Sequence, residues 1–269
     1  MKAKRIAYGC VGMLFFVSLC LLLCCSPLCK KGPKSGEVWK DPVLGMEFVW
    51  VQGGRYKMGC GSWTSDCNET EKPVHTVCVN GFWIGKYEVT QGQWRRLMGD
   101  NPYFFQECGD NCPVEFVSWD EVEKFARKLS QNAGYTFRLP TEAEWEYACR
   151  SGGKSEKYSG GDNADAVAWY AGNSGGRTHP VGQKRPNGLG IYDMSGNIGE
   201  FCQDWYDKDY YGRSPRNNPL GPSSNGHRVI RGGGWNTYRA SYERCASRDW
   251  TNPIGRSHNE GFRLVRVGR

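Results

Sequence analysis

Thirteen cysteines are the residues of this 269-residue chain with the most distinctive chemistry. They fall into two groups. The first lies in or beside an apolar N-terminal run and comprises Cys10, Cys20, Cys24, Cys25 and Cys29, and the second comprises Cys60, Cys67, Cys78, Cys108, Cys112, Cys149, Cys202 and Cys245. The even second group, combined with an export signal, favours disulfides in an oxidising compartment. Zinc binding is the alternative, but only the Cys108–Cys112 pair approaches ligand spacing, and no matching pair of histidines accompanies it.

No other residue pattern indicates a catalytic centre. The four histidines are scattered, and the chain has no zinc-binding HExxH pair, no G-x-S-x-G nucleophile turn and no phosphate-binding loop. The formal net charge of +7 arises mainly from residues 1–36, which contain six Lys and Arg and no acidic residue. The remainder is nearly neutral and has no basic stripe, so nucleic acid is excluded as a partner.

The N-terminal residues have the layout of a secretory signal. Residues 1–5 are positively charged and residues 6–23 are mostly apolar. Residues 22–25 resemble a bacterial lipobox, which makes Cys25 the candidate for lipidation. We therefore predict a lipoprotein signal peptide over 1–24, a lipid-anchored tether over 25–36 and one domain over 37–269, exported and anchored to the outer membrane or cell surface. An uncleaved transmembrane helix is the alternative, because the apolar run is nearly long enough to span a bilayer.

The elements that position the domain's side chains are short and separated by loops. With 36 Gly and 13 Pro, the domain is expected to be loop-rich. Helices are predicted over 90–99, 118–129 and 141–149, because Thr90, Ser118 and Thr141 each precede a Gln or Glu by three positions, the signature of a capping box. Strand-like runs are Met46–Met58, His75–Val89, Arg228–Arg231 and Gly261–Val267. The fold class is therefore α+β, and the first and last strands are expected to pair and close the domain.

Several motifs resemble those of the formylglycine-generating enzyme (sulfatase-modifying factor) family. They run in order through residues 45–268: GMEF (45–48), KYEVT (86–90), PV and VSW (113–119), RLPTEAEWEY (138–147), YDMSGN with Glu200 and Asp204-Trp205, RGGGW (231–235) and GFRL (261–264). The resemblance implies the irregular, C-type-lectin-like fold of that family, with little regular secondary structure.

The resemblance also implies that catalysis is absent. The family's enzymes oxidise a substrate cysteine with two cysteines of their own, which bind copper and lie before a third, structural cysteine that we match with Cys245. Here the segment between Trp235 and Cys245 contains no cysteine and is shorter than the enzymes' loop. Cu(I) selects soft sulfur ligands, so no copper is expected and formylglycine formation is not predicted.

The family's structural disulfides indicate how the cysteines pair. The resemblance implies a Cys149–Cys245 bond. A second family disulfide would need cysteines at Ala126 and Leu264, and both are missing together. The remaining pairs are expected to be local, Cys108 with Cys112 and Cys60 with Cys67, which leaves Cys78 to pair with Cys202 by elimination.

One structural calcium site of the family also has its counterpart here. The resemblance places its ligands at Asp193, at Glu200 and at the carbonyl groups of Gly196 and Ile198. Calcium prefers hard oxygen ligands of this kind, and Asp in place of the family's usual Asn adds negative charge. The alternative is that both carboxylates only cap turns.

The C-terminal loops combine aromatic, hydroxyl and amide side chains between scaffold positions. Tyr and Trp provide contact area at low entropic cost, and Ser, Thr and Asn provide adaptable hydrogen bonds. The expected ligand-binding residues are Thr237, Tyr238, Arg239, Tyr242, Ser247, Asp249, Trp250, Thr251, Asn252, Ser257, His258 and Asn259. The pattern resembles the lipid-anchored variable proteins of diversity-generating retroelements, in which such loops are diversified.

The sequence therefore predicts a non-catalytic surface lipoprotein that binds a protein or glycan through these loops. Two alternatives remain open. One is a structural component of an envelope complex, and the other is an oxidoreductase of the formylglycine-generating type with a relocated centre.

Overall fold

The computed structural model describes residues 32–268 of the chain. The predicted signal peptide and the lipidation of Cys25 lie outside the described residues. Pro33–Arg269 forms one compact unit. Over 32–268, no helix combines the length and the apolar character needed to cross a membrane.

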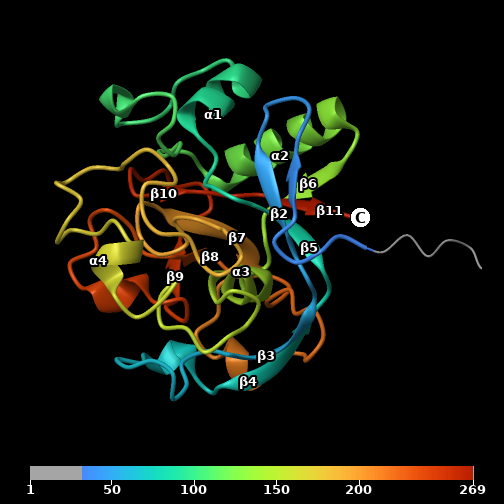
Figure 1. Cartoon of the computed structure of the whole chain (residues 1–269), viewed down its shortest axis with the longest axis vertical. Helices are drawn as coiled ribbons and strands as arrows, with labels where there is room; N and C mark the ends of the chain where they lie inside the picture. Colours follow the sequence, from blue (N-terminus) through green and yellow to red (C-terminus); the bar gives the residue numbers. More distant parts are fainter. Residues whose placement is uncertain (1–31, 269) are drawn as a thin grey trace, which may run out of the picture. The chain divides into compact units, whose positions relative to one another are not determined.

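Short strands make up three sheets within the described residues (Figure 1). The strands are β1 (Val38–Lys40), β2 (Glu47–Val51), β3 (Gly54–Met58), β4 (His75–Val79), β5 (Phe82–Gly85), β6 (Thr136–Arg138), β7 (Gly199–Trp205), β8 (Arg228–Arg231), β9 (Asp249–Thr251), β10 (Glu260–Gly261) and β11 (Val265–Val267). Five of them form a sheet in the order β1-β2-β5-β11-β6, four form a sheet in the order β10-β7-β8-β9, and β3 pairs with β4. The α+β class predicted from the sequence is confirmed.

The helices begin where the sequence predicts them. They are α1 (Gln91–Met98), α2 (Trp119–Ala133), α3 (Glu142–Cys149) and the single turn α4 (Ala164–Val167), with 3-10 turns at Glu69–Glu71, Gln106–Cys108, Tyr210–Gly212 and Ala240–Glu243. Thr90, Ser118 and Thr141 are the N-caps of the first three helices, and each forms a complete capping box. Gly99 and Gly134 end α1 and α2 in the left-handed conformation that glycine adopts without strain.

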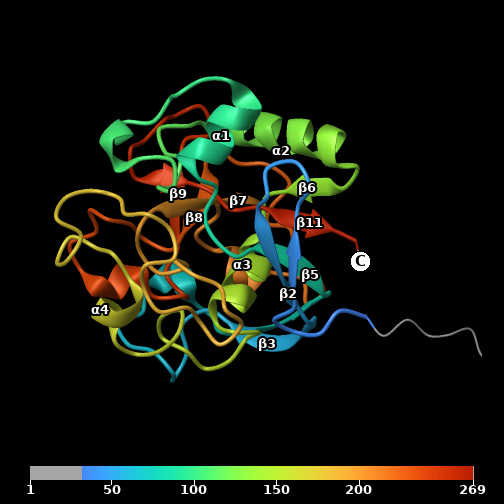
Figure 2. The ribbon, with the colours of Figure 1, turned by 45° about the horizontal axis from the view of Figure 1, so that its top comes forward.

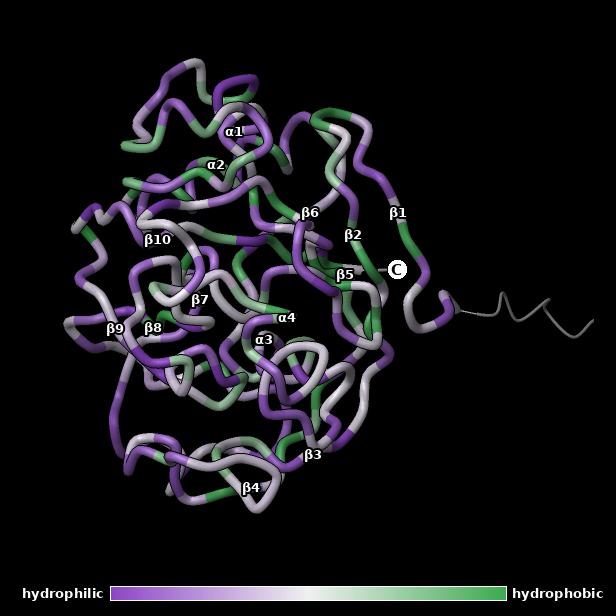
Figure 3. The backbone as a smooth tube through the Cα atoms, turned by 60° about the vertical axis from the view of Figure 1, so that its left-hand side comes forward, coloured by the Kyte–Doolittle hydropathy of each residue, from purple (hydrophilic) through white to green (hydrophobic). Residues whose placement is uncertain are grey.

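The five-stranded sheet separates two hydrophobic cores. Successive side chains of a strand point to opposite faces. Phe48 and Trp50 of β2 accordingly lie in the core shared with α1 and α2, and Val49 and Val51 lie in the core shared with α3. Because both faces are covered, β2 and β5 are largely apolar along their length, as the hydropathy colouring shows (Figure 3). The helices α1 and α2 lie next to each other above this sheet (Figure 2).

Two of the predicted strands are interrupted in the structure. The run 46–58 divides into β2 and β3, and the run 75–89 divides into β4 and β5. The prediction that the first and last strands pair is wrong, because β5 lies between β2 and β11. The turn residues Gly53 and Gly81 pack together at these breaks, where a Cβ atom on Gly53 would lie 2.5 Å from the nitrogen of Gly81.

A buried charge network joins α3 to β8 and to the C-terminal loops. The side chain of Arg231 is fully buried, with its Nη2 2.6 Å from Glu146 and its Nη1 3.4 Å from Glu142. Arg248 forms two bonds to Glu142, at 2.6 and 2.9 Å, and Arg150 lies 3.1 Å from Glu146. Buried charges are tolerated only when they are paired and hydrogen-bonded. The network therefore fixes the place of β8 and of the loop that carries Arg248.

Three of the four expected disulfides are present. Cys60–Cys67, Cys108–Cys112 and Cys149–Cys245 are bonded. The pairing of Cys78 with Cys202 inferred by elimination is wrong, because both thiols are free. Cys202 is buried on β7, where burial raises the pKa of its thiol well above the ordinary value.

Removal of the long-range disulfide is expected to destabilise the domain most. The Cys149–Cys245 bond has a sequence separation of 96 residues, and the Cys108–Cys112 bond has one of 4. In the chain-entropy model the first contributes about 4–5 kcal/mol and the second about 2 kcal/mol. Guanidinium unfolding of the full-length protein should show this order for the two double alanine variants. Equal losses of unfolding free energy would contradict it.

The buried carboxyl of Asp204 makes stability depend on pH. Burial, and then the carboxylate of Glu142, raise the pKa of Asp204 to about 8. In the unfolded chain this group ionises near pH 4, so from about pH 4 to about pH 8 the native state holds a proton that the unfolded state has lost, and native stability falls as pH rises. The free energy of unfolding of Asp204→Asn should therefore rise relative to that of the parent by about 2–3 kcal/mol between pH 5 and pH 7. A difference between variant and parent that is independent of pH in denaturant titrations would refute this assignment.

Candidate ligand-binding site

The C-terminal loops enclose a pocket of about 330 Å³. Its walls come from the four-stranded sheet and from the segment that follows β8. The lining residues are Gly199, Ile230, Arg231, Gly232, Gly233, Thr237, Tyr238, Tyr242, Ser247, Arg248, Asp249, Trp250, Asn259 and Glu260. The volume lies at the lower end of the roughly 300–1,000 Å³ typical of small-ligand sites.

Glycines leave room for a buried carboxyl group beside the pocket wall. Gly233 has a φ of +75°, and a Cβ atom at this position would lie only 2.2 Å from the Oε2 atom of Glu243. Glu243 is fully buried, and its Oε1 accepts a hydrogen bond from the Gly234 amide at 3.4 Å. Burial raises the pKa of Glu243 well above the ordinary value and so favours the neutral form of this side chain.

The charged residues that line the pocket differ in their pairing. Arg231 and Arg248 are bound to the glutamates of α3 within the buried network. Asp249 on β9 and Glu260 on β10 form no ion pair within residues 32–268. Burial, followed by the charge of Asp249, raises the pKa of Glu260 to about 7 despite a hydrogen bond from Thr251. The ionisable side chains of the pocket that lack an ion-pair partner are therefore both acidic.

Aromatic side chains stand at the pocket with much of their surface exposed. Tyr238 is 93% exposed, Trp250 49% and Tyr242 47%. The ring of Trp250 contacts His227, with the ring centres 4.0 Å apart, and is therefore supported from one side. Exposed aromatic rings beside a pocket provide contact area for a ligand at low cost in side-chain entropy.

The pocket brings together seven of the twelve residues predicted to bind a ligand. These are Thr237, Tyr238, Tyr242, Ser247, Asp249, Trp250 and Asn259. The other five lie outside the lining, and they are Arg239, Thr251, Asn252, Ser257 and His258. Thr251 still contributes indirectly, through its hydrogen bond to Glu260.

His258 belongs to a neighbouring aromatic cluster. Its ring centre lies 5.7 Å from that of Phe104 and 5.5 Å from that of Trp235, and Trp235 also contacts Phe105 at 5.1 Å. Phe104 is 68% exposed. The sequence did not reveal Phe104, Phe105 or Glu260 as neighbours of the C-terminal loops. Phe104 and Phe105 come from a distant segment, and a glutamate such as Glu260 is normally read as an exposed surface residue.

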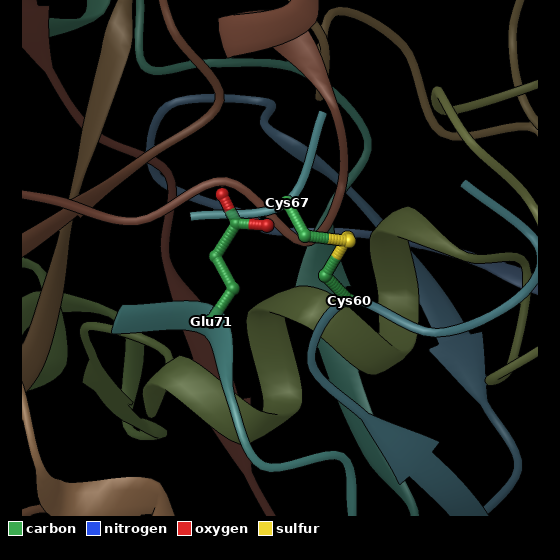
Figure 4. Close-up of side chains that lie close together, drawn as sticks. All are labelled: Cys60, Cys67 and Glu71. Atoms are coloured by element: carbon green, nitrogen blue, oxygen red, sulfur yellow. A yellow bond between two sulfur atoms is a disulfide. The ribbon is translucent and has the colours of Figure 1, made fainter. Parts of the chain in front are cut away.

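One group of cysteine and carboxylate side chains is compact enough to suggest a metal site within residues 32–268. It consists of Cys60, Cys67 and Glu71 (Figure 4). Both sulfurs are consumed in a disulfide, and both oxygens of Glu71 are bound by Arg244 at 2.8 Å. The group is therefore a structural link between the 60–71 segment and the residue before Cys245.

The predicted calcium ligands lie in a region with excess negative charge. Asp193 and Glu200 are buried, and Arg263 binds both oxygens of Glu200 at 2.6 Å. The neighbouring Glu88 is also buried, and its Oε1 has no hydrogen-bond partner. Burial, followed by the charges of Asp193 and Glu200, raises the pKa of Glu88 well above the ordinary value. The three carboxyl groups are not close enough to one another to form a compact group like that of Cys60, Cys67 and Glu71, and both oxygens of Glu200 are already bound by Arg263 and Trp145.

The fold combines short sheets with irregular loops, and its C-terminal segment lines much of the pocket. The family described as "Sulfatase-modifying factor enzyme 1-like domain" matches residues 34–267. The chain belongs to this family, as the sequence motifs predicted.

Proteins with different names share this scaffold. The chaperone protein LppX of Paenibacillus barcinonensis is 35% identical to the chain over 82% of the chain and 89% of that protein. The formylglycine-generating enzyme of Streptomyces coelicolor is 36% identical, and the matched region covers 68% of the chain and 60% of the enzyme. Among solved structures, Treponema denticola variable protein 1 superposes with a TM-score of 0.76 at 30% identity, over 86% of the chain and 99% of that protein.

Proposed function

We propose that this protein is a non-catalytic binding protein that recognises a protein or glycan ligand through the pocket of its C-terminal loops. The observation that carries the proposal is the position of Tyr238, Tyr242 and Trp250, which stand exposed at a pocket built on a rigid, disulfide-bonded scaffold. Loops held by such a scaffold are where binding residues concentrate.

The absence of thiols near the pocket supports a non-catalytic role. The segment 236–244 contains no cysteine, and Cys245 is held in a disulfide with Cys149. The free thiols Cys78 and Cys202 do not line the pocket. Copper-dependent oxidation of a cysteine therefore has no soft ligands at this position. Stoichiometric copper or iron in the purified protein would contradict this proposal.

The proposal extends to cellular location and to sequence variation. The apolar N-terminal run and Cys25 support export with a lipid anchor at the outer membrane or cell surface. The structural similarity to Treponema denticola variable protein 1 supports diversification of the 237–259 segment by a retroelement. A template repeat and a reverse transcriptase gene beside the coding sequence would be the corresponding genetic observation.

We also propose a structural calcium ion bound by Asp193 and Glu200 with the carbonyl groups of Gly196 and Ile198. The supporting observation is the excess of buried carboxyl groups, including Glu88 with its unpartnered oxygen. The ion would neutralise this charge and hold the turn that precedes β7.

The aromatic side chains of the pocket are expected to provide most of the binding energy. Glycan arrays and panels of purified surface proteins, probed with the full-length protein, should identify a ligand. Truncating a central aromatic anchor typically costs about 2 kcal/mol or more of binding free energy. The double variant Trp250→Ala with Tyr238→Ala should therefore bind that ligand at least about 30-fold more weakly. Ile254→Ala is the matched control, because Ile254 is 75% exposed and lies outside the pocket lining. Unchanged affinity of the double variant, or no ligand in either screen, would refute the proposal.

Calcium is expected to stabilise the native protein. At a calcium concentration 100-fold above the dissociation constant, the free energy of unfolding should rise by about 2.7 kcal/mol relative to protein in EDTA. Asp193→Ala should abolish this increase, whereas Asp162→Ala, which removes an exposed carboxylate, should retain it. Thermal unfolding curves that coincide in calcium and EDTA would show that the ion does not bind.

A further inference from the structure

The pocket contains an imbalance of charge that its own residues do not correct. The side chains of Arg231 and Arg248 are 0% and 1% exposed, and the glutamates of α3 bind both. Their guanidinium groups also donate to backbone carbonyls, those of Cys245 and Thr70 among them. Neither arginine is therefore available to an anionic ligand, or to the acidic residues of the pocket.

Two carboxylates reach the pocket from opposite edges of the four-stranded sheet. Asp249 lies on the edge strand β9, opposite Ile230 of β8, and Glu260 lies on the edge strand β10, opposite Gly199 of β7. Gly199 of β7 and Ile230 of β8 lie between them in the sheet, and both also line the pocket. The carboxylates thus converge on one cavity from separate strands.

Neither carboxylate has a cationic partner in the part of the chain that the structure describes. Asp249 accepts a hydrogen bond from the Trp250 amide at 2.8 Å through its Oδ1. The Oε2 atom of Glu260 is buried and has no hydrogen-bond partner. A buried carboxylate without a partner is unfavourable, and a cationic group held in the pocket would stabilise its charge.

The surroundings of these carboxylates suit a cation on a flexible apolar stem. Trp250 and Tyr242 are also among the residues that line the pocket, and the side chain of each is about half exposed. Aromatic faces attract ammonium and guanidinium groups and pack against methylene groups. A volume of about 330 Å³ accommodates a single side chain rather than a secondary-structure element.

We infer that the pocket binds a positively charged side chain, a lysine or arginine, presented by a protein or peptide ligand. Asp249 and Glu260 would pair with the cationic group, and Trp250 and Tyr242 would contact its stem. This inference rests on the binding role proposed above and specifies the chemistry that the pocket selects.

The test compares a cation with its neutral isostere. Calorimetric titration of the full-length protein, in mild detergent, would use Nα-acetyl-arginine amide and Nα-acetyl-citrulline amide, which differ in charge but hardly in shape. The arginine compound should bind at least 10-fold more tightly than the citrulline compound, and added salt should weaken it. Equal affinities, or no binding of the arginine compound at millimolar concentration, would overturn the inference. Free arginine should bind no more tightly than the blocked compound, because the pocket is matched to a side chain within a polypeptide.

Variants of the two carboxylates test whether these side chains cause the preference for a cation. Glu260→Gln combined with Asp249→Asn keeps the side-chain shapes. This double variant should bind the arginine compound at least 10-fold more weakly, without a change in thermal unfolding. Glu69→Gln is the matched control, because it removes an exposed carboxylate outside the pocket and should leave binding unchanged. Loss of binding in the control as well would overturn the assignment.

This experiment separates the inference from the proposed function. A neutral glycan whose binding depends on Trp250 and Tyr238 but is unaffected by Glu260→Gln would leave the binding role intact and refute the cation preference. If no ligand depended on either aromatic residue, both would be refuted.

Discussion

The buried pairing of two glutamates on α3 with arginines from other segments is the interaction on which the rest of the structure depends. Glu142 and Glu146 bind Arg231 on β8, Arg248 before β9 and Arg150 after α3. Removing one partner of such a network leaves a buried charge unpaired, which typically costs 3–5 kcal/mol. Two of these arginines, Arg231 and Arg248, also line the pocket. The domain therefore positions its candidate site with the same contacts that hold its interior together.

Local signals allowed much of the scaffold to be predicted from the sequence. The capping boxes at Thr90, Ser118 and Thr141 place three helix starts, because each depends on residues only three positions apart. The disulfide between Cys149 and Cys245 followed from the family resemblance. What depended on long-range pairing was missed. The strand β7 had no detectable periodicity, since it is buried on both faces, and nothing local distinguishes the free thiols of Cys78 and Cys202 from bonded ones.

The candidate site was predictable in composition but not in charge. A mixture of Tyr, Trp, Ser, Thr and Asn marked the 237–259 segment, and seven of the twelve chosen residues line one pocket. Glu260 escaped notice because a carboxylate beside a strand normally faces solvent. Glu260 and Asp249 lie on strands at opposite edges of the sheet, and only the folded structure shows that both line the same pocket. The chemistry of the site thus depends on topology rather than on any contiguous motif.

The pocket is lined by residues from all four strands of its sheet and from the loops beside them. Tyr238 exposes nearly all of its surface and Trp250 about half, so exchanging them alters little of what is packed inside. The proposed recognition can therefore change at these exposed positions without disturbing the interior, whereas Arg231 and Arg248 serve both the buried network and the pocket lining. A protein built in this way would acquire new ligands over evolutionary time through a few surface substitutions, while the underlying architecture is inherited unchanged.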